Sequence, residues 1–347
     1  MAKRPLFFLL LVLFSACEKP LRLPYITPEL HNWPKTYKGV TGLRLHVFTT
    51  GTLAARDKLV YRDGGLLGTV PLDILVFVIE HPRRGLILVG TGLNRKIADD
   101  TERYLGAFRA SLGTPAMEKG QDILAQLKRA KLPAAKVRYI ILPDLRFDHT
   151  GALASFPSAQ PVVSSAEYEA ATDEKESPLS LSKEYAEVRE WRFIDFAGAQ
   201  PLGTFLAHRD LFNDGSVLLL DASGATAGGL AVLVRLPAAP VLLGGNLAWT
   251  KKHYLYTRLP GLLFDREACW EKIWRLKKFK DLVPELAVLP DHDWEAVEAA
   301  KTKDMVLHPF PAGEAVEASG KEGRGKKPNQ ESKNPGRKRH EGKKTGS

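Results

Sequence analysis

The stretch RYIILPDLRFDHTGAL, residues 138–153, decides the fold of this chain. It begins with a short apolar run containing a pair of β-branched isoleucines and a tyrosine, which predicts a buried strand over 138–142. Pro143 ends that strand. A polar loop follows, and we expect a helix to begin near His149. The loop places four polar side chains within six residues: Asp144, Arg146, Asp148 and His149.

Two interpretations of this loop remain open from its residues alone. Alternate residues of an extended segment face the same side, so Asp144, Arg146 and Asp148 can point into one pocket with His149 beside them. Such a pocket is typical of a metal or acid–base site. In the other interpretation the strand simply ends here, and Asp148 caps the following helix.

Composition indicates a folded body with basic ends. The chain has 347 residues, 44% of them hydrophobic, with enough aromatic side chains for a large core. Its net charge is +10, but residues 321–347 alone carry +7 and Lys3 and Arg4 add two more. The body is therefore close to neutral. It shows no phosphate-binding glycine loop and no basic face studded with aromatic residues, so we expect no specific nucleic-acid binding.

The N-terminus has the pattern of a targeting segment. Lys3 and Arg4 precede the apolar run Leu6–Phe14, which is too short to span a bilayer as a helix. Two small residues then lead to Cys17, so residues 1–16 resemble a bacterial lipoprotein signal. We expect Cys17 to be lipidated and the protein to be anchored in a bacterial cell envelope. An ordinary secretory signal and an uncleaved anchor remain alternatives.

Three further segments are predicted from composition. Residues 17–39 are rich in proline and indicate an extended tether. Residues 40–310 alternate strands and helices in two groups and predict one domain. Residues 311–347 combine Gly, Lys, Glu, Pro and Asn, which indicates a disordered basic tail able to contact anionic surfaces.

The grouping of strands predicts the architecture of the body. Two sets of strands, each accompanied by helices, suggest two sheets packed on one another with helices outside. The fold class that we expect is α/β, an αβ/βα four-layer sandwich.

Several motifs within Leu43–Asp293 resemble those of the metallo-β-lactamase fold family, in the branch of the N-acyl-homoserine lactonases. Phe77–Gly92 is similar to the hairpin motif LIEHPxG-xxLxDTG. Ile140–Leu153 is similar to the metal-binding loop SHxHxDHxGG, and Pro290–Asp293 to the final GHD. The resemblance implies the four-layer sandwich with two metal ions, usually zinc, between the sheets.

The chain departs from the ligand set that this resemblance implies. The positions of the first, second and third histidines and of the bridging aspartate hold Asp144, Arg146, Ala225 and Asn246. An alanine donates nothing to a metal, and an arginine is a fixed cation that repels one. We therefore expect no dinuclear zinc centre, and we expect Arg146 to occupy the vacated space and pair with Asp148 or Asp144.

Three implied ligands of the second ion remain: Asp148, His149 and His292. Three protein ligands are the number that a catalytic zinc uses, with a position left open for water. The sequence therefore allows one zinc ion at most.

Two functions follow as expectations. The first is a membrane-anchored, lactonase-like lipoprotein with little or no hydrolase activity. It binds a small-molecule or protein ligand in the cleft that holds the metal ions in the family. The alternative is a hydrolase of a lactone or ester that uses one zinc ion on Asp148, His149 and His292. In that case Asp144 or Asp148 acts as the base. A tyrosine, Tyr254 or Tyr256, then donates to the oxyanion.

Overall fold

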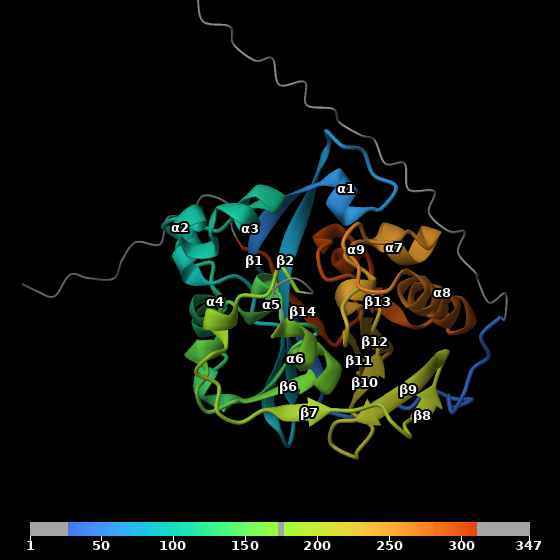
Figure 1. Ribbon diagram of the computed structural model, residues 1–347. Helices are drawn as coiled ribbons and strands as arrows, with labels where there is room; N and C mark the ends of the chain where they lie inside the picture. The colour runs from blue at the N-terminus through green and yellow to red at the C-terminus, as the bar shows by residue number, and fades with distance from the viewer. Residues whose placement is uncertain (1–26, 173–176, 311–347) are drawn as a thin grey trace, which may run out of the picture. The chain divides into compact units, whose positions relative to one another are not determined.

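Two β-sheets packed face to face form the centre of the fold, and helices cover their outer faces (Figure 1). The computed structural model describes residues 27–172 and 177–310. Leu45 and Val47 of the first sheet share one buried cluster with Leu219 and Val232 of the second. The predicted α/β four-layer sandwich is confirmed.

The first sheet contains the loop that opened the sequence analysis. Its strand order is β14-β1-β2-β3-β5-β6-β7, with β4 paired to β1. The bounds are β1 Arg44–Arg56, β2 Thr69–His81, β3 Gly85–Val89, β4 Gly113–Ala116, β5 Val137–Ile141, β6 Gln160–Ser164, β7 Arg192–Ile194 and β14 Met305–His308. Strands β3, β5, β6 and β7 run parallel to one another.

The second sheet has the strand order β13-β12-β11-β10-β9-β8. The bounds are β8 Gln200–Leu202, β9 Phe205–Asp210, β10 Val217–Asp221, β11 Leu230–Arg235, β12 Pro240–Leu243 and β13 Ala287–Leu289. Because β10, β11 and β12 are buried on both faces, their sequences are continuous apolar runs rather than alternating patterns.

The helices are mostly short. The α-helices are α1 Asp57–Val60, α2 Thr101–Leu105, α3 Ala107–Leu112, α4 Ile123–Arg129, α5 Phe147–Thr150, α6 Ser165–Ala171, α7 Lys251–Tyr256, α8 Arg266–Leu282 and α9 Trp294–Ala299. The 3₁₀ helices are η1 Arg95–Ala98, η2 Ala134–Lys136, η3 Leu153–Ser155, η4 Ser182–Glu184 and η5 Gly245–Leu247.

Helix α8 shows why such elements form where they do. Asp265 caps its start by accepting hydrogen bonds from the amides of Glu267 and Ala268, 2.9 and 3.0 Å long. Ile273 and Leu276 are fully buried against the outer face of the second sheet. The helix is therefore held by its cap and by one apolar stripe.

Strand β1 is longer than its sequence pattern predicts. After the run of alternating side chains at its start, β1 continues to Arg56 through a shift in register between Thr49 and Thr52. Gly51 in this bulge has φ of 151°, and a Cβ there would lie 2.6 Å from the carbonyl oxygen of Ala116. The glycine thus lets β1 bend and pair with β4.

The described part of the predicted tether, 27–39, lies against the second sheet. His31 and Gly203 exchange two backbone hydrogen bonds of 2.8 Å, and the ring of Trp33 packs edge-on against Phe279. The signal over 1–16, Cys17 and the basic tail lie outside the described residues. Within the described ranges, the structure contains no helix with the length and apolar character that crossing a membrane requires.

Candidate metal centre

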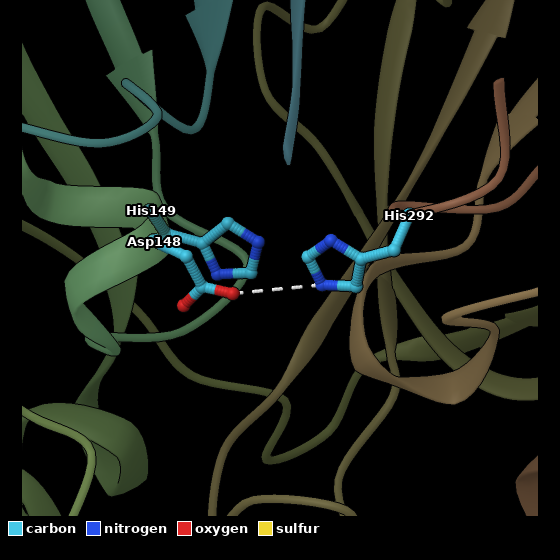
Figure 2. A group of neighbouring side chains, drawn as sticks. All are labelled: Asp148, His149 and His292. Atoms are coloured by element: carbon cyan, nitrogen blue, oxygen red, sulfur yellow. Dashed lines mark ion pairs between the residues drawn. The ribbon is translucent and has the colours of Figure 1, made fainter. Parts of the chain in front are cut away.

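Two loops from opposite sheets bring the candidate ligands together. Strand β5 leads into Pro143 and then into α5, the single turn that carries Asp148 and His149. Strand β13 of the second sheet leads to Asp291 and His292. Figure 2 shows Asp148 and His149 on one side of the site and His292 facing them from the other.

Asp148, His149 and His292 form a buried group with metal-ligand character. One ligand atom from each lies within 4.8 Å of the others. The Nε2 atom of His292 is 3.5 Å from Oδ2 of Asp148, the contact marked in Figure 2. The fold therefore gathers three of the ligands that the resemblance implies for the second ion.

The orientation of His292 is set by the backbone. Its Nδ1 lies 2.9 Å from the carbonyl oxygen of Asp73. Because a carbonyl only accepts hydrogen bonds, Nδ1 donates this bond, and Nε2 is the ring nitrogen that faces Asp148. The contact with the backbone thus orients the imidazole so that Nε2 is the atom available to a cation.

His149 lies between two carboxylates. Its Nδ1 is 2.7 Å from Oδ1 of Asp144, and its Nε2 is 3.0 Å from Oδ2 of Asp291. Burial lowers the pKa of His149, but the charge of Asp144, the charge of Asp148 and both hydrogen bonds outweigh it and hold that pKa well above its usual value. An ion bound to Nε2 therefore has to displace a proton and the carboxylate of Asp291.

Asp144 is fully buried and accepts a second hydrogen bond at Oδ1 from the amide of Arg146, 2.9 Å long. Burial raises its pKa, and the neighbouring charges of His149 and Arg146 outweigh that effect and lower it. These contacts favour a role in orienting His149 over the role of base that we expected for Asp144.

Arg146 is directed at Asn246 rather than at Asp148. Its Nη1 donates to Oδ1 of Asn246 at 3.1 Å, and its Cζ lies 5.3 Å from the ring centre of Trp249. Its Nε is 3.9 Å from Oδ2 of Asp144. The same Asn246 oxygen accepts from Nε1 of Trp249 at 2.8 Å. Three positions of the implied ligand set thus form one hydrogen-bonded unit without a metal.

A cavity of about 220 Å³ opens beside Arg146. Ala225, which stands at the implied third-histidine position, also lines it, and the rest of the wall mixes apolar side chains such as Leu262 and Phe264 with polar ones, among them Glu167. The small side chain of Ala225 leaves room that a histidine would fill.

The buried charges near this group fit a cation. Three carboxylates, Asp144, Asp148 and Asp291, are accompanied by one guanidinium and the imidazole of His149. The Oδ1 atom of Asp148 is buried and has no hydrogen-bond partner in the described part of the chain. A buried carboxylate oxygen without a partner is costly, and a metal ion is one way to satisfy it.

Two acidic residues that support the site were not among the predicted site residues. Glu167 accepts from the backbone amides of Leu145 and Gly228, and Glu184 contacts Thr150 of α5. Burial raises the pKa of Glu184 to about 8. Glu184 belongs to no motif, so no local signal identifies it.

Asp291 did carry a signal, since it takes the place of glycine in the final GHD motif that this chain resembles. Of the two tyrosines that we considered, Tyr256 is 71% exposed. Tyr254 is partly buried and packs against the apolar cluster between α8 and the second sheet. Neither tyrosine lines the cavity beside Arg146.

Comparisons with known proteins agree with this fold. The N-acyl homoserine lactonase AttM of Agrobacterium fabrum is 27% identical over 261 residues, which cover 74% of this chain and 95% of that protein. A structure of N-acyl homoserine lactone hydrolase with the product N-hexanoyl-L-homoserine at its catalytic metal centre has a TM-score of 0.64 at 22% identity. That alignment covers 77% of this chain and 98% of the other. AidC, a dizinc quorum-quenching lactonase, has a TM-score of 0.52 at 16% identity, with coverage of 74% and 90%.

The family assignment rests on most of the body. The sequence model of the metallo-β-lactamase superfamily matches residues 69–296, a span from β2 into α9 that includes α5 and His292. The match, the four-layer sandwich and the order of motifs lead to one conclusion: this chain belongs to the metallo-β-lactamase superfamily.

Proposed function

We propose that this protein is a hydrolase of a lactone or another ester that uses a single metal ion. The observation that carries the proposal is the buried group of Asp148, His149 and His292, with ligand atoms within 4.8 Å of one another. The lactonases among the relatives support the reaction class, since their names describe opening of an acylated lactone.

The chain's own residues define what such a site does. Asp148, His149 and His292 would hold the ion, and a divalent ion there polarises an ester carbonyl and acidifies water. Asp144 fixes the imidazole of His149 through the bond to Nδ1. Oδ1 of Asp148 has no protein hydrogen bond in the described residues, so it is the oxygen that this residue would offer to the ion.

The test combines metal content with turnover. Purified full-length protein is analysed for bound metals and assayed against a series of acyl-homoserine lactones and a simple aryl ester. We expect about one equivalent of a divalent ion, and we expect His292→Ala to lose both the ion and at least about 100-fold in kcat/KM.

His208→Ala is the matched control. His208 is a half-buried residue of β9 whose Nδ1 contacts the carbonyl of Gln200. This variant should keep both the ion and the rate. Unchanged turnover in His292→Ala, or purified protein that takes up no ion from a metal-supplemented buffer, would overturn the proposal.

Non-catalytic binding is a second candidate, and the contacts of Arg146 favour it. The guanidinium is held by Asn246 and lies over Trp249 at the wall of the 220 Å³ cavity. A cation fixed in this way holds a ligand without a metal. Saturable binding of a lactone or carboxylate in the presence of a chelator, without product formation, would support this reading over hydrolysis.

We also propose that the protein is anchored in a bacterial envelope through lipid on Cys17, on the evidence of the N-terminal pattern alone. Metabolic labelling with a palmitate analogue should mark the wild-type protein but not Cys17→Ser. Equal labelling of the two proteins would refute lipidation at Cys17.

A further inference from the structure

A second group of charged residues lies far from the metal-ligand group in the topology of the first sheet. An open cavity of about 510 Å³ is lined by seven residues: Arg83, Arg84, Gly85, Lys136, Arg138, Tyr139 and Gln160. Four of the seven are cationic and none is acidic. Because the body as a whole is nearly neutral, this is a local concentration of positive charge.

The cavity lies where three parallel strands begin. Gly85 starts β3, Val137 starts β5 and Gln160 starts β6, and these strands are neighbours in the first sheet. Asp148 and His149 follow the other end of β5. The basic cavity and the metal-ligand group therefore lie beyond opposite ends of the same sheet, and one can be altered without touching the other.

The turn that carries two of the arginines is held in place before any ligand arrives. His81 accepts hydrogen bonds at Nδ1 from the amides of Arg83 and Arg84, 3.1 and 3.2 Å long. Its Nε2 lies 3.1 Å from the hydroxyl of Ser216 in the second sheet. The guanidinium carbon of Arg84 lies 5.1 Å from the ring centre of Phe212. Because the turn is already ordered, less conformational entropy is lost when a ligand binds to it.

Gly85 brings the cations of the turn close to those of β5. Its φ is 79°, and a Cβ on it would lie 2.7 Å from the carbonyl oxygen of Lys136 and 3.3 Å from Cγ of Arg138. Only glycine permits both this conformation and this approach. Positive side chains from two segments therefore share one cavity.

Most of these charges lack a protein counterion. Arg83 pairs with Asp214 at 2.9 Å. In the two described ranges, Arg84, Lys136 and Arg138 have no ion pair with an acidic residue. Like charges held together repel one another, and a multiply charged anion relieves that repulsion.

We propose that this cavity binds a phosphate-bearing ligand. A guanidinium group can donate two parallel hydrogen bonds to two oxygens of one phosphate group, and a lysine beside it adds a positive point charge. The three cations without an ion pair, Arg84, Lys136 and Arg138, therefore match a phosphoryl group. The phosphate belongs either to a free phosphorylated compound or to a phospholipid headgroup. The proposal does not depend on the hydrolase activity, because no residue of the metal-ligand group takes part.

The experiment compares two double variants of the full-length chain. Arg84→Gln/Arg138→Gln removes two exposed cations of the cavity. Arg95→Gln/Arg103→Gln removes two exposed arginines of η1 and α2 and changes the net charge equally. Binding of inorganic pyrophosphate is measured by calorimetry, and binding to phosphatidylcholine vesicles with and without phosphatidic acid by sedimentation.

We expect wild type and the Arg95/Arg103 variant to bind pyrophosphate alike, and the Arg84/Arg138 variant to bind at least about tenfold more weakly. If vesicle binding falls in that variant as well, a headgroup is a source of the phosphate; if it persists, the ligand is a free compound. The basic tail is present in every protein, so it cancels in the comparison. Equal pyrophosphate binding by the two variants, or none by the wild type, overturns the proposal.

Discussion

The two metal positions of the implied dinuclear centre differ in how many of their ligands this chain retains. The first-ion side consists of Asp144, Arg146 and Ala225, and the second-ion side of Asp148, His149 and His292. On the first-ion side an arginine is bonded to Asn246 beside a cavity. On the second-ion side the three ligand atoms still converge. The difference teaches that the fold holds the loops in place whether or not every metal ligand is present.

The carboxylate that joins the two sides gives the largest expected effect. Asp144 accepts from the amide of Arg146 and from His149, and it is fully buried. Asp144→Ala should lower the free energy of unfolding by about 3–5 kcal/mol, because it leaves buried charges on both sides without their partner. Urea denaturation measures this. The exposed Asp99→Ala should cost less than about 0.5 kcal/mol, and equal losses in the two variants would contradict the role given to Asp144.

The support of the second-ion side should depend on pH. Burial raises the pKa of Glu184 to about 8, and this acid contacts Thr150 of α5. A carboxyl group with a raised folded-state pKa contributes stability that is complete below its unfolded-state value, near 4.5, and is lost as the pH rises through 8. The Glu184 carboxyl group alone should therefore account for a loss of roughly 2–4 kcal/mol of unfolding free energy between those pH values.

Glu184→Gln should remove most of this slope, because an amide keeps the polar contacts and cannot ionise. Denaturation at several pH values measures it, with the exposed Glu187→Gln as the matched control. A slope that survives in Glu184→Gln would assign the pH dependence to another group.

The cation of the first-ion side should oppose metal binding on the second. Arg146→Met removes a fixed positive charge while Asn246 keeps its bond from Trp249. We expect several-fold tighter zinc binding in titrations, because the charge that repels the ion is gone. Weaker zinc binding in Arg146→Met would mean that the arginine helps to form the site.

The smallest expected effect concerns Tyr256, which we first considered as an oxyanion donor. The ring is 71% exposed. Tyr256→Phe should leave kcat/KM for an accepted lactone within about twofold of wild type, a change of less than about 0.5 kcal/mol. A larger loss would require α7 to turn its side chain toward the substrate.

The sequence was most informative where chemistry repeats a local pattern. The apolar run of β5 and the Asp-His pair after it predicted both the strand and the residues that meet at the site. Glu184 was not predicted, because its role comes from a long-range contact with Thr150 of α5. The extent of β1 is not evident from the sequence, because Gly51 lies at a bulge inside the strand and a glycine is also typical of a strand end. Of the two partners expected for Arg146, Asp144 lies 3.9 Å from its Nε, whereas its hydrogen bond to Asn246 was not predicted because it depends on geometry across the two sheets.

If Cys17 carries lipid as we propose, the attachment of residues 27–39 to the second sheet limits how far the body can lie from the membrane. His31 is paired with Gly203, and Trp33 is packed on Phe279. This stretch is therefore part of the folded body and does not add to the length of the tether. With lipid on Cys17, only the chain from 17 to 27 is left to span the gap, and fully extended it reaches at most about 36 Å. The protein would then work within one protein diameter of the bilayer surface and meet the substrates present in that layer.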